Sequence, residues 1–310
     1  MARSCTPAPS NEAATKIDRL TEAVHAVGEC PVWRAAEAAL YWVDIPARRI
    51  HRLHPETLGA RSWAAPEMVA CFAFDLDSRL VAGMETGIFA LTLGADGTVA
   101  SRHLASPAFP MGGMRFNDGR CDRQGRFWAG TMHMDMPAAH AVGALYRYTA
   151  ADGLSAPMEP GLLTQNGLAW SPKGDRMYLS DSHPRARTIW EFDYDIPSGT
   201  PSNRRVFVDM SQHAGRPDGA AVDVDGCYWT CANDAGLLLR FTPEGRLDRS
   251  IALPVLKPSM CAFGGAGLDT LYVTSIRPQK AEEIAAQPLA GAVFSLRPST
   301  QGLPEPEFRA

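Results

Sequence analysis

The segments CDRQGRFWAGT (121–131) and SPKGDRMYLSD (171–181) decide the fold, because they are two copies of one unit. Each begins with a turn and continues into a short apolar and aromatic strand that ends in a small or polar residue. Four further copies are AALYWVD (38–44), DLDSRLVAGM (75–84), DVDGCYWTC (223–231) and AGLDTLYVTS (266–275). The strand ends, near 44, 84, 131, 181, 231 and 275, recur at intervals of 40 to 50 residues. Six units with room for about four strands each predict an all-β, six-bladed β-propeller with four-stranded antiparallel blades.

Further strands can be assigned around these copies. In the fourth unit, NGLAW (166–170), MYLSD (177–181), TIWEFDYD (188–195) and RRVFVD (204–209) are four strands, with a turn over 196–203. The last unit has three, PSMCAFG (258–264), TLYVTS (270–275) and GAVFSLRP (291–298), so we expect LTEAVHAV (20–27) to close it. Only AEEIAAQ (281–287) is typical of a helical turn.

The expected organisation is a disordered N-terminal tail over 1–16, one propeller domain over 17–300 and a C-terminal tail over 301–310. A β-sandwich or two packed barrels also contain many short strands. A regular interval repeated six times favours the propeller.

Composition excludes several other classes. The 27 Gly and 24 Pro are spread along the chain, which indicates many short elements joined by turns. With 30 Lys and Arg against 34 Asp and Glu, the net charge of −4 argues against nucleic-acid and membrane partners. Because neither a signal peptide nor a spanning stretch is present, we expect a cytoplasmic protein. We also expect a monomer or a weak homo-oligomer. The seven cysteines form no C-x-x-C, so we expect them to be reduced and mostly buried.

Polar residues recur at one phase of the repeat. About 13 to 15 residues before the strand ends stand Glu29, Asn117 with Asp118, Asn166 and Asp218, in four of the six units. The innermost strands of a propeller all begin at the same end of the central channel. These side chains should therefore converge on one point.

Converging carboxylates repel one another unless a cation lies among them, so the pattern indicates a metal site. Oxygen ligands without matching Cys or His suit calcium, magnesium or manganese better than a thiolate zinc site. The alternative is that NDG (117–119), QNG (165–167) and PDG (217–219) are ordinary turns. Glu29 favours the metal site, because GECP is not a turn formula and still has the right phase.

At these residues the chain resembles the senescence marker protein/regucalcin and gluconolactonase family of six-bladed propellers. The resemblance runs from about 24 to 298 and rests on several separate motifs. They include GECPVW (28–33), RFNDGRCDRQGRFWAGTM (115–132), QNGLAWSPKGDRMYLSDS (165–182), PDGAAVDVDG (217–226) and CAFGG (261–265).

The resemblance implies hydrolysis of a sugar lactone with one divalent cation at the channel mouth. The implied metal ligands are Glu29, Asn166 and Asp218, and the implied substrate-binding residues are Arg115, Asn117 and Asp135. The family usually has Glu where Asp135 stands and Gly where Cys30 stands, so the lactone that fits and the metal environment stay open. The cation itself is open among calcium, zinc, manganese, magnesium and ferrous iron.

The chemistry suits these residues independently. A cation that holds the lactone carbonyl oxygen stabilises the oxyanion formed when water attacks. Asp218 is the predicted catalytic proton acceptor, with Asp118 as the alternative. Arabinono-, galactono-, xylono- and gluconolactone are all candidate substrates. Two other hypotheses remain: a non-catalytic calcium-binding or interaction propeller, and a metal-dependent hydrolase of phosphotriesters.

Overall fold

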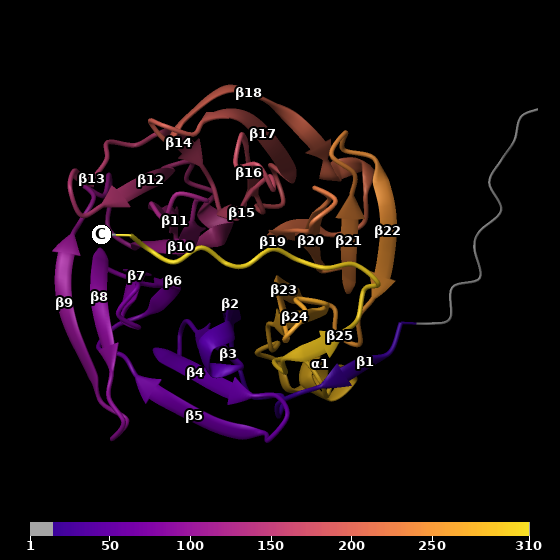
Figure 1. Cartoon of the computed structure of the whole chain (residues 1–310). Coiled ribbons are helices and arrows are strands. Elements are labelled where there is room, and N and C mark those ends of the chain that lie inside the picture. The colour runs from indigo at the N-terminus through magenta and orange to yellow at the C-terminus, as the bar shows by residue number, and fades with distance from the viewer. Residues whose placement is uncertain (1–14, 310) are drawn as a thin grey trace, which may run out of the picture.

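Six antiparallel sheets surround one central axis like the blades of a propeller, in a computed structural model that describes residues 15–309 (Figure 1). In blades 1 to 5 the strands lie in chain order from the axis outward, and in blade 6 the outermost strand comes from the N-terminal side of the chain. The predicted all-β, six-bladed propeller is confirmed. The predicted disordered tail, residues 1–16, lies outside the described residues except for Thr15 and Lys16.

Blades 1 to 3 occupy the first half of the chain. Blade 1 contains β2 (Gly28–Arg34), β3 (Ala39–Asp44), β4 (Arg49–His54) and β5 (Gly59–Ala64). Blade 2 contains β6 (Val69–Phe74), β7 (Leu80–Met84), β8 (Ile88–Leu93) and β9 (Val99–Ala105). Blade 3 contains β10 (Met114–Cys121), β11 (Phe127–His133), β12 (Gly143–Thr149) and two short strands on β12, β13 (Gly153–Leu154) and β14 (Glu159–Leu162).

Blades 4 to 6 complete the ring. Blade 4 contains β15 (Gln165–Trp170), β16 (Arg176–Asp181), β17 (Thr188–Asp195) and β18 (Thr200–Asp209). Blade 5 contains β19 (Arg216–Val222), β20 (Tyr228–Asn233), β21 (Leu237–Phe241) and β22 (Leu247–Ala252). Blade 6 contains β23 (Pro258–Gly264), β24 (Thr270–Ser275) and β25 (Phe294–Leu296). The predicted turn over 196–203 is too long, because β18 already pairs with β17 from Thr200 onward.

Four short helical segments interrupt the described chain. They are the 3₁₀ turns Ala35–Glu37, Met136–Ala138 and Met210–Gln212, and α1 (Ala281–Ala286). The helical turn predicted over 281–287 is confirmed. Within residues 15–309, no helix is long and apolar enough to cross a membrane.

Blade 6 receives its fourth strand from the N-terminal side, as predicted, but from a different segment. The strand is β1 (Ile17–Arg19), which pairs antiparallel with β25. The prediction of a strand over 20–27 is wrong, because those residues carry the chain from blade 6 to the inner strand of blade 1. The Asp44 carboxylate accepts hydrogen bonds from the Ala26 and Val27 amides and holds this crossing.

Each of the six inner strands is interrupted near its beginning by a shift in pairing register. The shifts lie at Glu29/Val32, Val69/Cys71, Phe116/Gly119, Asn166/Ala169, Pro217/Ala220 and Pro258/Cys261. A bulge bends its strand and re-aims the local side chains. The polar residues of the repeat therefore stand at bulged positions instead of in a regular ladder.

A recurring aspartate stabilises the turn that follows an inner strand, at the end opposite the bulge. The Oδ1 atoms of Asp75, Asp122 and Asp223 each accept two backbone N–H bonds, from the second and fourth residues that follow. Such turns satisfy backbone donors that the short connection leaves unpaired.

The blades pack through aromatic and apolar side chains. Trp128, Trp170 and Trp229 are fully buried, and the rings of Trp128 in blade 3 and Trp170 in blade 4 lie 6.1 Å apart. Burying each such side chain contributes roughly 1.5–3 kcal/mol. The six described cysteines are all buried free thiols, which confirms the sequence-based expectation for them, and Cys5 lies outside the described residues.

The C-terminal segment crosses the face of the propeller where the inner strands end (Figure 1). Gly302 bridges to Asp223 in blade 5, and Phe308 bridges to Asp75 in blade 2. Between these bridges, Glu305 forms an ion pair with the buried Arg120 at 3.4 Å. Residues 302–308 therefore cover one end of the channel and leave the end with the bulges as the candidate site.

Candidate functional site

Three predicted metal ligands come from three blades at one end of the channel. Glu29 is the second residue of β2, Asn166 the second of β15 and Asp218 the third of β19. Asn166 and Asp218 are buried and Glu29 is half-buried. Inner strands that run in the same sense place these early positions at the same mouth.

Electrostatics show that the carboxylates lie near one another. Burial raises the pKa of Glu29 well above its ordinary range, and the nearby charges of Asp218 and Asp118 raise it further. The Arg115 guanidinium lowers it. An acidic cluster of this kind holds its protons unless a cation compensates the charge. The arrangement therefore fits a divalent cation, as the repeat predicts.

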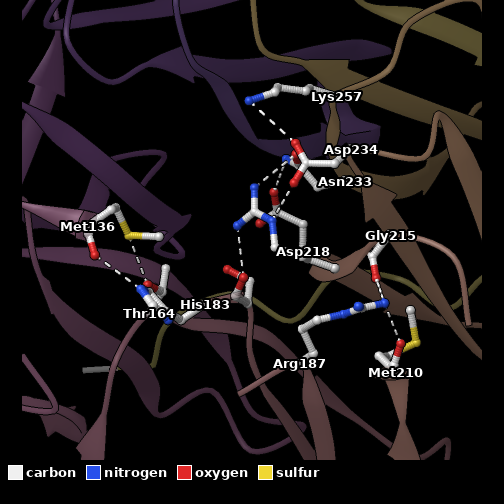
Figure 2. A network of polar contacts seen from close by, with 12 residues as sticks. Met136, Thr164, His183, Arg187, Met210, Gly215, Asp218, Asn233, Asp234 and Lys257 are labelled. Carbon is white, nitrogen blue, oxygen red and sulfur yellow. Dashed lines mark hydrogen bonds and ion pairs between the residues drawn. The ribbon is translucent and has the colours of Figure 1, made fainter. Parts of the chain in front are cut away.

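The Asp218 carboxylate accepts one short hydrogen bond from the described residues. Asn233, at the end of β20, donates from Nδ2 to Asp218 Oδ2 at 2.6 Å (Figure 2). Burial raises the pKa of Asp218 to about 7, while Arg216 and the bond from Asn233 oppose the rise. A carboxyl with this pKa can hold or release a proton near neutrality, which suits a proton acceptor.

Asn166 is oriented in a similar way. Its Nδ2 donates to Ser182 Oγ at 2.9 Å, which directs the amide oxygen away from Ser182. Within residues 15–309, no three His, Cys, Asp or Glu side chains are grouped closely enough to hold a metal among themselves. The predicted set of two carboxylates and one carboxamide is not such a group, and its oxygen atoms suit a hard cation.

Arg115 and Asn117 form a second unit on β10. Arg115 Nη1 donates to Asn117 Oδ1 at 2.8 Å, and Asn117 Nδ2 donates to the Gln165 carbonyl at 2.7 Å. Burial lowers the pKa of Arg115 to about 10, and the charge of Glu29 opposes that fall. A guanidinium is thus kept next to the acidic cluster, where it can bind an oxygen-rich ligand.

Asp118 follows Asn117 on β10 and is buried. Its Oδ2 accepts from the Leu168 amide at 2.9 Å, and its Oδ1 is buried without a hydrogen-bond partner among the described residues. Burial raises its pKa, and Arg120 opposes the rise. Asp118 therefore belongs to the acidic cluster, although its backbone contact is with the middle of β15.

Asp135 is placed differently from the other predicted substrate contacts. It follows β11 at the same end of the channel, is exposed, and accepts from the Ala138 amide at 3.3 Å, which caps the turn Met136–Ala138. No contact joins its carboxylate to Glu29, Asn166 or Asp218 among the described residues. Its predicted role in sugar binding stays a prediction.

Cys30, next to Glu29, has its thiol turned toward blade 2. The sulfur accepts from the Phe72 amide at 3.2 Å and donates to the Phe72 carbonyl at 3.6 Å. Cys30 has φ of 49°, a left-handed conformation that favours glycine. The backbone here thus keeps the geometry of a glycine, and burial raises the thiol pKa so that it stays protonated.

Asn233 and Ser182 hydrogen-bond two predicted ligands directly, and the sequence reasoning missed them. Both stand at strand ends: Asn233 ends β20, and Ser182 follows β16. The recurring small or polar residue at these ends was a usable signal. In an antiparallel pair, the end of the second strand of a blade lies beside the beginning of its innermost strand.

We expect Gly167→Ala to destabilise the protein by about 1–3 kcal/mol and to weaken the site. Gly167 has φ of +61°, and an added Cβ would lie 2.5 Å from Ser180 Oγ and 3.1 Å from the Asp218 carbonyl oxygen. Urea unfolding measures the loss. The matched control is Gly153→Ala, because Gly153 has φ of +71° and open space around it. Equal losses in both variants would show that crowding at the site is unimportant.

Without divalent cations, the protein should lose stability as the pH rises from about 4 to about 7. The pKa of Asp218 rises from an ordinary 3.8 to about 7 on folding, so in this window the folded state keeps a proton that the unfolded chain has released. The contribution of Asp218 to stability is therefore fully present below pH 4 and is lost as the pH rises through 7. Urea unfolding with a chelator at pH 4.5 and 7 tests this, and Asp218→Asn should make the difference in stability smaller, with Glu29 supplying part of what remains. An unchanged pH dependence in that variant would contradict the assignment.

Comparisons with known proteins identify the family of this chain. Residues 27–277 match the SMP-30/Gluconolactonase/LRE-like region. The chain is 40% identical to the 6-deoxy-6-sulfogluconolactonase of Pseudomonas putida over 91% of this chain and 94% of that protein. It is 33% identical to the L-arabinolactonase of Azospirillum brasilense over 93% and 94%, respectively.

A solved structure is similar over nearly the whole fold. The calcium-binding protein regucalcin from Agrobacterium tumefaciens superposes with a TM-score of 0.88 at 26% identity, covering 96% of this chain and 98% of that one. The matched region, residues 27–277, covers most of the propeller. This chain belongs to the SMP-30/gluconolactonase/LRE-like family.

Proposed function

We propose that this protein hydrolyses a sugar lactone to the aldonic acid with the help of one divalent cation. The observation that carries the proposal is the acidic cluster of Glu29, Asp118 and Asp218 beside Arg115 at one channel mouth. The relatives named as lactonases support the reaction.

The proposed cation ligands are Glu29, Asn166 and Asp218. Asn233 donates to Asp218 Oδ2, and the Asn166 amide nitrogen donates to Ser182, so Asp218 and Asn166 each keep an oxygen for a cation. When bound, the cation would polarise the lactone carbonyl. Calcium is a specific candidate because the Agrobacterium relative is named as a calcium-binding protein. Zinc, manganese, magnesium and ferrous iron are tested beside it.

The chain's own residues would bind the lactone and accept a proton. Water adds to the carbonyl carbon, the ring C–O bond breaks, and the ring oxygen leaves as a hydroxyl group. Asp218 would take the proton of the attacking water, and the leaving oxygen is protonated in return. The product acid then ionises, so each turnover releases one proton to solvent.

Arg115 and Asn117 are the proposed contacts for the lactone's oxygen atoms. They are already linked at 2.8 Å, so little side-chain freedom is lost on binding. Asp135 is proposed to contact sugar hydroxyls from the exposed turn after β11. We place the reaction in the cytoplasm, because the six described cysteines are free thiols.

A panel of aldonolactones with a proton-release assay tests the proposal. It contains arabinono-, galactono-, xylono- and gluconolactone, together with 6-deoxy-6-sulfogluconolactone on the basis of the 40% identical relative. Each cation is added separately to cation-free protein. Hydrolysis of at least one lactone supports the enzyme. Calcium binding without any hydrolysis would favour a non-catalytic calcium-binding propeller. Hydrolysis of phosphotriesters but of no lactone would favour the phosphotriester hydrolase.

A further inference from the structure

The Arg216 guanidinium donates hydrogen bonds to three different residues near the channel mouth. It begins β19 two residues before Asp218. Its Nε donates to Asp234 Oδ2 at 2.6 Å, its Nη1 to the Ser182 carbonyl at 2.8 Å and its Nη2 to Asn233 Oδ1 at 3.2 Å. The acceptors lie on blades 4 and 5, so one guanidinium joins two blades.

The first branch runs through Asn233 to Asp218. Asn233 is 1% exposed, and its amide has one oxygen and one nitrogen to place. Because Arg216 donates to the oxygen, the nitrogen must face Asp218, to whose Oδ2 it donates at 2.6 Å. Figure 2 shows Asn233 and Asp218 in contact within this network. Arg216, which can only donate, and the Asp218 carboxylate, which can only accept, thus hold the Asn233 amide in one orientation from its two sides.

The second branch runs through Ser182 to Asn166. Arg216 holds the Ser182 carbonyl, and the buried Ser182 hydroxyl accepts from Asn166 Nδ2 at 2.9 Å. The guanidinium is itself held from outside, since Asp234 accepts from its Nε and pairs with Lys257 at 3.4 Å (Figure 2). Both branches start from the same planar group.

We propose that Arg216 is a positioning residue that orients two cation ligands, Asp218 and Asn166, through Asn233 and Ser182. The inference rests on the proposed function, because it takes these two residues as ligands. The role needs the forked shape of a guanidinium, because Nη1 donates to Ser182 and Nη2 donates to Asn233. A lysine keeps the charge and loses the fork. Outer partners of this kind typically change metal affinity by 10–100-fold.

Calorimetric titration of the cation-free protein with Ca²⁺ and with Mn²⁺ tests the proposal. We expect Arg216→Lys to bind the cation 10–100-fold more weakly. Excess cation should then restore most of kcat, because Arg216 does not contact the reacting atoms. The matched control is Arg205→Lys, since Arg205 donates to Glu191 and Asp193 on the outer strands of blade 4. This control should bind the cation like the wild type.

A double-mutant cycle separates positioning from simple charge. If Arg216 acts partly through Asn233, then adding Arg216→Lys to Asn233→Ala should weaken binding by a smaller factor than Arg216→Lys does in the wild type, because only the Ser182 branch is left to lose. Circular dichroism checks the fold of each variant. Ser182→Ala removes only a hydroxyl, and it supplies the same cycle on the Asn166 branch should Asn233→Ala not fold.

Two outcomes would overturn the inference while leaving the proposed function in place. One is wild-type affinity in Arg216→Lys, and the other is full additivity in the cycle. A wild-type protein that binds neither cation would overturn the cation site of the proposed function, and this inference with it.

Discussion

Asp218→Ala should reduce kcat for lactone hydrolysis by about 10²–10⁴-fold while the propeller remains folded. The substitution removes both a proposed ligand and the proposed proton acceptor. The fold should survive, because the lost carboxylate is one of a group whose charges repel: Asp218 and Asp118 both raise the pKa of Glu29. The main structural loss is the acceptor for Asn233, which costs about 1–3 kcal/mol.

The proton-release assay and circular dichroism measure these two outcomes together. Asp218→Asn is a closer replacement and should lose a similar part of kcat, since an amide cannot accept the proton. Asp193→Ala on β17 is the matched control, because Asp193 is exposed on an outer strand and pairs with Arg205. Wild-type activity in Asp218→Asn would remove Asp218 from the proton transfer and leave Asp118 as the acceptor.

Removing divalent cations should abolish lactone hydrolysis and lower stability. Burial keeps the pKa of Glu29 and of Asp218 above their ordinary values, so the folded protein carries an acidic cluster that a cation would compensate. A ligand that binds only the folded state, added at 100 times its Kd, stabilises it by about 2.7 kcal/mol. Thermal unfolding and the proton-release assay, before and after dialysis against a chelator, test this expectation.

The variant proteins make the cation experiment specific. Asp218→Ala should gain little stability from added cation, whereas Asp193→Ala should gain as much as the wild type. In the dialysed wild-type protein, adding calcium or manganese back should restore lactone hydrolysis. Full activity in a folded sample proven free of metal would contradict the cation mechanism.

The fold could be predicted from sequence because its signals are local. The turn and strand of each unit lie within about ten residues, and the recurring aspartates bind backbone amides two and four residues away. The closing strand was misplaced because β1 pairs with β25 nearly 280 residues later, as Ile17 with Leu296. Local pattern does not choose between neighbouring segments such as 17–19 and 20–27.

The candidate site could be predicted in part for the same reason. Glu29, Asn166 and Asp218 each stand 13 to 15 residues before the end of the strand in their repeat unit. This shared position predicts that they reach the same end of the channel. Asn233 and Ser182 were missed because their partners lie on other strands or other turns, 15 and 16 residues away along the chain. Asp135 shares the end of the channel but caps its own turn.

The sequence by itself determined the repeat, the number of blades and the side chains that face one channel mouth, because each depends on spacing along the chain. Only the tertiary structure decided how those side chains are held. The bulges re-aim the inner strands, and the Arg216 guanidinium joins Ser182 in blade 4 to Asn233 in blade 5. Such contacts depend on where two blades meet in space, which no spacing along one strand specifies.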